Sequence, residues 1–267
     1  MSNNWLKITD KVYVVTGGSS GIGLSIVEEL LAQGAKVANF DIQDSDLKHE
    51  NLMFQQVDVT SREAVETGVA ATVEAFGTID GLVNNAGINI PALLVDAKEA
   101  HSKYELNDAI FDKMIAINTK GLYLVAQAVG RILVDKKDGV IINMGSESGL
   151  EGSEGQSCYA ATKAAVYSFT RSWAKELGKS NIRVVGVAPG IMEETGLRTL
   201  AYEEALAYTR NKTVEELRAG YSNTSTIPLG RSGYLNEVGS TVAFLLSEKA
   251  GYITGVTINI AGGKTRG

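Results

Sequence analysis

The sequence predicts a doubly wound α/β fold, in which helices cover both faces of a single parallel sheet. Short apolar runs of the strand type alternate with helical patterns along all 267 residues. The first run leads through a glycine-rich turn into a helix, and the runs at 140–142 and 184–187 are continuously apolar, as in strands buried on both faces. Such alternation implies right-handed crossovers and parallel strands. No change of composition marks a boundary, so we expect one domain over residues 1–267.

The first half of the chain contains four expected strands. They cover residues 12–15, 36–40, 52–57 and 81–83. Between them, one helical pattern begins at Ile22 and ends at Gly34, and a second covers residues 62–76. The polar stretch 89–107 that follows is longer than most connections between elements.

The second half continues the alternation. A helical pattern at 109–134 contains Asn118, a strand at 139–144 leads into Ser146, and the next helix carries Tyr159. The last three regular elements are expected at residues 182–187 (strand), 237–246 (helix) and 256–260 (strand). Residues 192–226 form a polar, helical insertion, which we expect to be a substrate lid over the carboxyl edge of the sheet.

Composition narrows the class of protein. A formal net charge of -6 argues against a nucleic-acid partner, which would require a basic face. The one cysteine, Cys158, cannot form an internal disulfide, which fits a cytoplasmic location. No apolar run is long enough for a membrane span and the N-terminal segment has no signal-peptide core, so we expect no membrane partner. His49 and His101 are isolated in the sequence and indicate no metal site.

The glycine turn between the first strand and the first helix is typical of a dinucleotide site. Gly17, Gly21 and Gly23 would let the backbone approach a pyrophosphate, which then meets the helix N-terminus. Asp41 ends the second strand, where a carboxylate accepts hydrogen bonds from ribose hydroxyls and repels a 2′-phosphate. The turn carries Ser19 and no Arg or Lys, so the sequence predicts NAD(H) over NADP(H).

Tyr159 and Lys163 form the candidate acid/base pair. They are four residues apart in an alanine-rich helical stretch, so both lie on one face of the helix. A cation beside a phenol favours the phenolate and lowers the pKa of the tyrosine toward neutrality. That arrangement suits general acid/base catalysis.

These motifs together resemble the short-chain dehydrogenase/reductase family. The glycine spacing T-G-x-x-x-G-x-G begins at Thr16, and the other family motifs follow in order over nearly the whole chain. They are Asn84-Asn85-Ala86-Gly87, Asn118, Ser146, Tyr159-x-x-x-Lys163 and Pro189-Gly190. The resemblance implies an NAD-dependent oxidoreductase with a Rossmann-type sheet.

The resemblance also implies roles for individual residues. Tyr159 would exchange the proton of the substrate oxygen, which Ser146 would orient; Lys163 would bind the nicotinamide ribose and lower the pKa of Tyr159. Asn118 would support a proton relay through water. The implied cofactor-binding residues are Gly17, Ser19, Ser20, Gly21, Ile22, Gly23, Asp41, Asp58, Val59, Asn85, Ala86, Gly87, Tyr159, Lys163, Pro189, Gly190 and Ile191.

The substrate is indicated by the polar segments around the site. Residues 89–107 and 192–226 are polar, which favours a hydroxyl-rich substrate over an acyl chain or steroid. The stretches 151–159, 194–202 and 262–267 resemble the bacterial sorbitol-6-phosphate 2-dehydrogenase subfamily, which implies D-sorbitol 6-phosphate and D-fructose 6-phosphate as the reacting pair. The candidate substrate residues are Ser148 and Arg198, and more weakly Lys264 or Arg266 for the phosphate.

Several alternatives stay open at this level. Another polyol dehydrogenase or a 3-oxoacyl thioester reductase would carry the same catalytic motifs. A non-catalytic nucleotide-sensing protein could share the fold. The helices that contain Asn118 and Tyr159 are apolar on more than one face, and the family resemblance suggests a homotetramer built on them.

Overall fold

The sheet has seven parallel strands, as the sequence predicts, and their order is β3-β2-β1-β4-β5-β6-β7. The computed structural model describes residues 5–196 and 198–264. The strands are β1 (Val12–Thr16), β2 (Lys36–Asp41), β3 (Leu52–Gln56), β4 (Gly81–Asn84), β5 (Gly139–Met144), β6 (Ile182–Pro189) and β7 (Thr257–Ile260). The strand order reverses between β1 and β4, which is where open α/β sheets bind ligands at their carboxyl edge.

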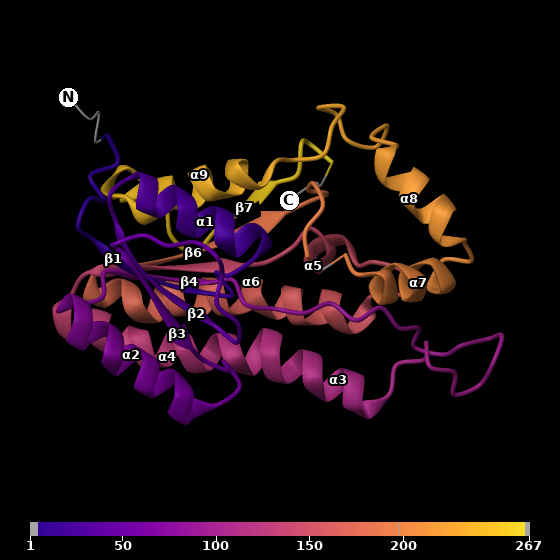
Figure 1. Cartoon of the computed structure of the whole chain (residues 1–267), viewed down its shortest axis with the longest axis horizontal. Helices are drawn as coiled ribbons and strands as arrows, with labels where there is room; N and C mark the ends of the chain where they lie inside the picture. Colours follow the sequence, from indigo (N-terminus) through magenta and orange to yellow (C-terminus); the bar gives the residue numbers. More distant parts are fainter. Residues whose placement is uncertain (1–4, 197, 265–267) are drawn as a thin grey trace.

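Helices form a layer on each side of the sheet (Figure 1). One layer contains α1 (Gly21–Ala32) and α9 (Leu235–Leu246). The other contains α2 (Arg62–Phe76), α4 (Leu122–Lys136) and α6 (Ser157–Leu177). The remaining short elements are α3 (Asp108–Ile115), η1 (Ala116–Gly121), α5 (Ser148–Glu151), η2 (Gly178–Ser180), α7 (Leu200–Thr209), α8 (Val214–Ser222) and η3 (Glu248–Ala250).

The two layers enclose separate hydrophobic cores, because alternate strand residues point to opposite faces. In β1, Tyr13 and Val15 pack with the α1 and α9 side, while Val14 packs with the α2, α4 and α6 side. All three are buried. This burial on both faces explains why the strand segments lack the apolar-polar alternation of an exposed sheet.

The long helix expected at 109–134 is present but is not uniformly α-helical. Between α3 and α4, residues Ala116–Gly121 form a π-helical turn, η1, in which Asn118 is buried. The side chain of Asn118 hydrogen-bonds the main chain of Ile88, outside the helix. Single π turns of this kind are frequent at functional sites. A hydrophobic periodicity does not distinguish such a turn from an α-helix, so the sequence analysis missed it.

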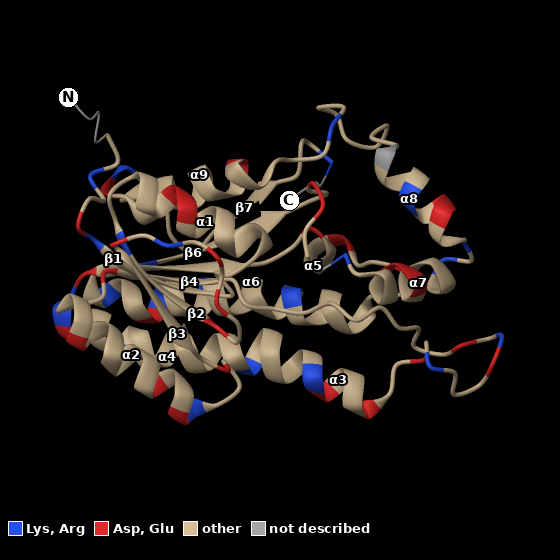
Figure 2. Ribbon diagram, in the orientation of Figure 1, with Lys and Arg blue, Asp and Glu red and all other residues tan. Residues whose placement is uncertain are grey.

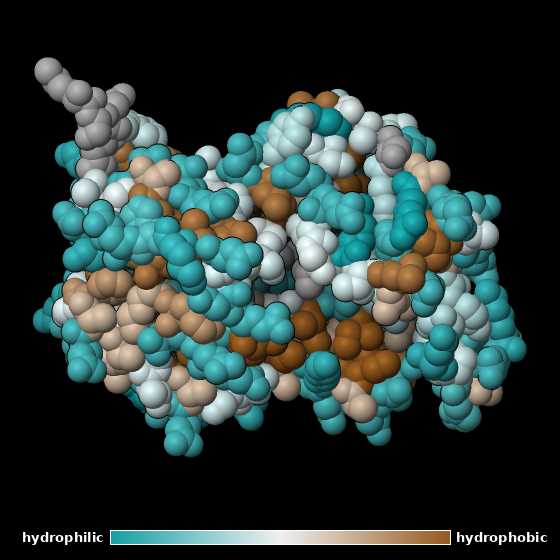
Figure 3. All heavy atoms as spheres, in the orientation of Figure 1, coloured by the Kyte–Doolittle hydropathy of each residue, from teal (hydrophilic) through white to brown (hydrophobic). Residues whose placement is uncertain are grey.

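Residues 192–226 contain the expected helices, α7 and α8, which lie at one end of the molecule (Figure 1). The two helices share a small core of their own, in which Leu206, Ala207 and Leu217 are buried. They carry charges of both signs (Figure 2). Figure 3 shows that hydrophilic residues cover most of the visible face, with hydrophobic residues gathered in patches between them.

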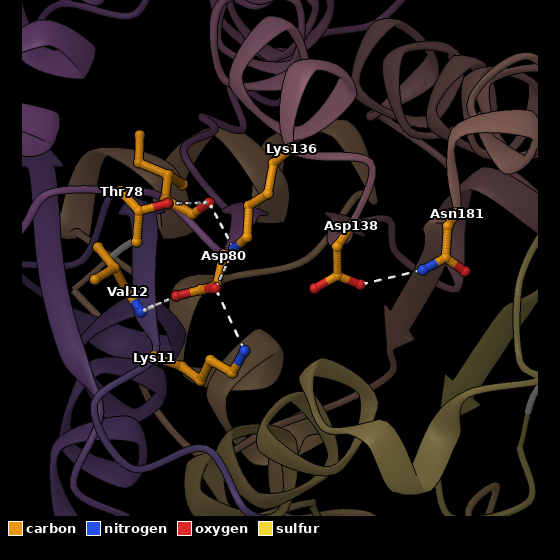
Figure 4. Close-up of polar contacts among 8 residues, drawn as sticks. Lys11, Val12, Thr78, Asp80, Lys136, Asp138 and Asn181 are labelled. Atoms are coloured by element: carbon orange, nitrogen blue, oxygen red, sulfur yellow. Dashed lines mark hydrogen bonds and ion pairs between the residues drawn. The ribbon is translucent and has the colours of Figure 1, made fainter.

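A buried carboxylate, that of Asp80, connects two strands and a helix at the amino edge of the sheet. Asp80 precedes β4, accepts a hydrogen bond from the Val12 amide at 2.8 Å, and forms ion pairs with Lys136 and, at 3.5 Å, with Lys11 (Figure 4). It therefore links β1, β4 and the end of α4 at the edge opposite the glycine turn. No helix among the described residues is long and apolar enough to cross a membrane.

Candidate active site

The glycine turn after β1 has the backbone shape that its sequence requires. Gly17 and Gly21 have φ values of 65° and 52°, a region that side chains disfavour. A Cβ added to Gly23 would lie 1.9 Å from the carbonyl oxygen of Gly17, so only glycine fits there. The amide of Asn85 donates to the carbonyl oxygens of Thr16 and Gly17 at 3.1 and 3.0 Å, so its side chain braces the turn.

Asp41 lies at the end of β2 beside this turn. Its Oδ2 accepts a hydrogen bond from the amide of Ser19 at 3.0 Å, and its Oδ1 accepts one from the amide of Ile42 at 2.7 Å. The hydroxyl of Ser19 accepts a hydrogen bond from Asn39 at 2.8 Å and donates to the Gln43 carbonyl oxygen at 2.5 Å. Ser19 therefore shapes the turn and fixes the carboxylate.

A cleft runs from the glycine turn to Tyr159 and Lys163 at the carboxyl edge of the sheet. The predicted residues that line it are Gly17, Ser20, Gly21, Ile22, Gly23, Asp41, Asp58, Val59, Asn85, Ala86, Gly87, Tyr159, Lys163 and Pro189. Lys163 is the one cation among the described lining residues, and it lies at the Tyr159 end rather than beside Asp41. The exposed glycine backbone, the carboxylate at one end and the ammonium at the other fit a dinucleotide with a ribose at each end.

Ser146, Ser148 and Tyr159 meet where β5 ends and α6 begins. The hydroxyl of Ser148 donates to Ser146 Oγ at 3.0 Å, and the Ser148 amide donates to the same oxygen at 3.3 Å. A hydrogen bond from the Ser146 side chain also reaches Tyr159. Ser148 thus orients Ser146. Because Ser146 Oγ accepts both of these hydrogen bonds, its own hydroxyl hydrogen can be donated to the phenol oxygen of Tyr159 or to a substrate oxygen beside it.

Lys163 is buried and held to the sheet. Its Nζ donates to the carbonyl oxygen of Met144 at 2.8 Å and lies 5.8 Å from the centre of the Tyr159 ring. A Cβ added to Gly87 would lie 3.6 Å from Lys163 Nζ and 3.3 Å from Asn118 Oδ1, so the absence of a side chain at Gly87 keeps this corner of the cleft open.

The electrostatics of the Tyr159–Lys163 pair differ from expectation. Burial raises the pKa of Tyr159 to about 12, against a smaller opposing effect of the Ser146 hydrogen bond. Burial also lowers the pKa of Lys163 to about 8. The protein alone therefore raises the Tyr159 pKa instead of lowering it, because desolvation outweighs the Ser146 hydrogen bond. The ammonium of Lys163 donates to Met144 and lies beside the ring of Tyr159.

Some predicted cofactor and substrate residues lie outside the lining of this cleft. Ile191 lines a separate hollow with Ile227 and Pro228, and its carbonyl oxygen accepts from the Gly233 amide at 3.0 Å. Gly190 packs against Ala261. Ser19, Asn118 and Ser146 are not among the lining residues, but each hydrogen-bonds one of them: Asp41, Ile88 and Tyr159, respectively. Ser148, also outside the lining, donates to Ser146.

Two of the basic substrate candidates are described. Arg198 stacks on the ring of Tyr221, with its guanidinium carbon 3.8 Å from the ring centre. Lys264 forms an ion pair with Glu147 at 2.6 Å, so its charge is already matched by a carboxylate. Arg266 lies outside the described residues.

The cleft also has lining residues that sequence reasoning missed. They are Phe40, Ile42, Val57, Ile88, Ile117, Met144, Gly145, Thr195 and Gly196. Phe40 and Met144 could have been found, because they lie at the carboxyl ends of strands β2 and β5, which point to this edge. Thr195 could not, because it comes from the 192–226 segment and approaches Gly21 only through the tertiary fold, its Cβ being 3.3 Å from a Cβ added there.

A doubly wound sheet with this cleft, and with a serine, tyrosine and lysine at its end, is that of an oxidoreductase with a nicotinamide cofactor. The chain belongs to the short-chain dehydrogenase family, whose model matches residues 11–205. This confirms the family that the motifs indicate, and with it the enzyme class.

Curated relatives match the chain from end to end. Sorbitol-6-phosphate 2-dehydrogenase of Klebsiella pneumoniae is 60% identical, over an alignment that covers 99% of this chain and 100% of the relative. A 3-oxoacyl-[acyl-carrier-protein] reductase of Thermotoga maritima is 37% identical, over 97% of this chain and 99% of the relative.

Solved structures share the fold. Levodione reductase superposes with a TM-score of 0.83 at 31% identity, over 97% of this chain and 98% of that one. The 3-ketoacyl-(acyl-carrier-protein) reductase of Brucella melitensis, complexed with NADH, has a TM-score of 0.80 at 26% identity, over 97% and 100% of the two chains.

Proposed function

We propose that this protein is an NAD-dependent dehydrogenase that interconverts D-sorbitol 6-phosphate and D-fructose 6-phosphate. The observation that carries the proposal is the 60% identity to a sorbitol-6-phosphate 2-dehydrogenase over the full length of both chains. The reacting alcohol is then at carbon 2, and its oxidation gives the corresponding ketone. A 3-oxoacyl reductase aligns with this chain over nearly the same length, but at only 37% identity, which makes a thioester substrate the weaker candidate.

The chemistry requires a proton and a hydride to leave the same alcohol. A bound nicotinamide supplies the hydride acceptor. Tyr159 takes the hydroxyl proton in oxidation and returns it in reduction, with Ser146 donating a hydrogen bond to the substrate oxygen. Lys163, fixed by Met144, contributes the positive charge that favours the phenolate. Because burial alone raises the Tyr159 pKa, an oxidised nicotinamide bound in the cleft would supply further positive charge that favours the phenolate.

NAD(H) is the proposed cofactor rather than NADP(H). The support is Asp41, whose carboxylate lines the cleft and is fixed by two backbone amides. A 2′-phosphate in this position would meet that negative charge without a cation among the described lining residues beside it. Asp58 and Val59 would contact the adenine end.

We assign residues 192–226 to a substrate lid on a single domain. Thr195 and Gly196 line the cleft, and α7 hydrogen-bonds the segment before Tyr159 through Tyr202 and Gln156 at 3.0 Å. The family resemblance supports a homotetramer, in which the outer faces of α4 and α6 would pack against partners. A monomer in light scattering would contradict that assembly.

The test is a substrate panel followed by absorbance of NADH. It contains D-sorbitol 6-phosphate, D-sorbitol, a second hexitol phosphate and a 3-oxoacyl thioester, each with NAD(H) and NADP(H). We expect D-sorbitol 6-phosphate with NAD to give the highest kcat/KM. A preference for the thioester would establish the reductase instead, and NADH binding without turnover of any substrate would establish a nucleotide-sensing protein.

A further inference from the structure

We propose that Arg210, at the end of α7, binds the phosphate group of the substrate, together with Tyr202 and Gln156. The inference rests on the proposed function, because it locates the feature that distinguishes a polyol phosphate from a free polyol. Sequence reasoning selected Arg198 and did not single out Arg210.

Arg210 belongs to a hydrogen-bonded chain that leads to the catalytic helix. Its Nη2 donates to Ser153 Oγ at 3.2 Å, and Ser153 Oγ donates to Gln156 Oε1 at 2.7 Å. Gln156 Nε2 donates to the hydroxyl of Tyr202 at 3.0 Å. Gln156 is only 8% exposed, so the middle of this chain is fixed by its surroundings.

The hydrogen-bonded side chains from Arg210 to Tyr202 lie at a distance from Tyr159 that suits the length of a hexitol 6-phosphate. Gln156 is the N-cap residue of α6, three residues before Tyr159, so its backbone lies about one helical turn, roughly 5 Å, from that of Tyr159. Six bonds separate carbon 2 of a hexitol 6-phosphate from its phosphorus, which is roughly 7 Å when extended. Tyr202 is near enough for its charge to contribute to the raised pKa of Tyr159.

The backbone around Arg210 is closely packed. A Cβ added to Gly155 would lie 2.1 Å from Thr209 Oγ1, so the loop before Gln156 fits directly against the end of α7. The Gly155 carbonyl oxygen accepts from the Ala92 amide at 2.8 Å, which ties the same loop to the segment after β4. Such packing holds the guanidinium in place before a ligand arrives.

The charge of Arg210 is available for an anion. Arg218 pairs with Glu203 at 2.6 Å, and Arg231 pairs with Glu237 at 2.5 Å. Within residues 5–196 and 198–264, no carboxylate lies in ion-pair range of Arg210, whose guanidinium contact is a neutral hydroxyl. A guanidinium presents five N–H donors in a planar fork that matches phosphate oxygens, so most of its donors remain for the ligand.

Arg198 is a second cation of the same region. The face of its guanidinium is stacked on the ring of Tyr221. Its positive charge, like that of Arg210, acts to lower the pKa of Tyr202. Stacking leaves the edge of a guanidinium free to donate. Both arginines therefore lie near Tyr202, and Arg210 is the one that is hydrogen-bonded to the loop before the catalytic tyrosine.

The test compares Arg210→Gln with Lys212→Gln, which removes one positive charge from the same segment. For D-sorbitol 6-phosphate, we expect Arg210→Gln to raise KM about 10- to 100-fold at nearly unchanged kcat, from the loss of charge-assisted hydrogen bonds. KM for D-sorbitol should stay within about twofold, as should the Kd for NADH. Lys212→Gln should change none of these values.

Two further readings keep the result decisive. Inorganic phosphate should inhibit the wild type competitively and Arg210→Gln much more weakly. Arg210→Lys keeps the positive charge and loses the planar set of guanidinium donors, so it should give an intermediate KM. This variant also tests the inference if Arg210→Gln does not fold. An equal change of KM for both alcohols, or no change for either, would overturn the inference alone. A wild type that shows no preference for the phosphorylated alcohol would overturn the proposed function as well.

Discussion

The side chain of Asn118 makes a reciprocal pair of hydrogen bonds with the main chain of Ile88. Its Oδ1 accepts from the Ile88 amide at 2.8 Å, and its Nδ2 donates to the Ile88 carbonyl oxygen at 2.8 Å. The remaining amide hydrogen goes to Thr162 Oγ1 at 3.1 Å. Because three of its four hydrogen-bonding positions are taken, two of them by Ile88, we assign Asn118 to positioning the Ile88 wall of the cleft.

Replacing Asn118 with leucine should weaken both the fold and the cofactor site. The substitution leaves the Ile88 polar groups without partners, and we expect a loss of about 2–4 kcal/mol in the free energy of unfolding together with a higher Kd for NADH. Asn118→Asp keeps the acceptor and should lose less. Urea denaturation and NADH fluorescence measure the two effects. NADH affinity of Asn118→Leu equal to that of the wild type would contradict the positioning role.

The two directions of the reaction should depend oppositely on pH. Burial raises the pKa of Tyr159 to about 12, so the phenol is protonated and ready to donate to a ketone throughout the neutral range. Alcohol oxidation needs the phenolate, and its kcat/KM should rise between pH 7 and 9, by up to about tenfold per unit. Ketone reduction should stay level or fall over the same range. An oxidation rate that falls across it would exclude Tyr159 as the base.

Asp41 should control the choice between the two nicotinamide cofactors. Asp41→Asn keeps the size of the side chain and removes the negative charge beside the expected ribose. We expect kcat/KM with NAD to fall and that with NADP to rise, each by about tenfold, on the scale of one charge-assisted contact. Asp46→Asn, which removes a charge outside the cleft lining, is the control. Wild-type protein with equal efficiency for both cofactors would refute the assignment.

Asp80 should matter for stability and not for chemistry. Burial alone would raise its pKa, but the hydrogen bonds from Lys136 and the Val12 amide, with the charges of Lys136 and Lys11, hold it below the ordinary value. We expect Asp80→Asn to cost about 1.5–3 kcal/mol in the free energy of unfolding at pH 7. Asp44→Asn, which breaks the exposed pair with Lys48, should cost under about 0.5 kcal/mol.

The lowered pKa of Asp80 determines how the difference in unfolding free energy between wild type and Asp80→Asn changes with pH. The stabilising contribution of Asp80 is complete above the unfolded-state pKa, near 4, and is lost as the pH falls through the lower folded-state pKa. The gap between wild type and Asp80→Asn in urea denaturation should therefore narrow at acid pH. A gap that stays constant from pH 7 down to pH 2 would mean that the carboxylate charge is not its source.

Local sequence patterns predicted most of the fold and many of the residues that line the cleft. Helix Arg62–Phe76 has the expected bounds, and Gly17, Asp41 and Lys163 line one cleft as their positions in the strand–helix pattern imply. The π turn at Asn118 could not be predicted, because the apolar periodicity does not distinguish it from an α-helix and the Asn118 side chain bonds Ile88, thirty residues away. The pKa of Tyr159 and the place of Arg210 depend likewise on burial and on contacts between distant segments.

The most direct test of the central claim compares wild-type protein with Tyr159→Phe on D-sorbitol 6-phosphate and NAD, following NADH absorbance. The phenylalanine keeps the ring and removes the proton acceptor. We expect steady NADH formation by the wild type, a loss of at least about 10³-fold in kcat for the variant, and an unchanged Kd for NADH. Comparable turnover by Tyr159→Phe, or no NADH from the wild type, would contradict the claim.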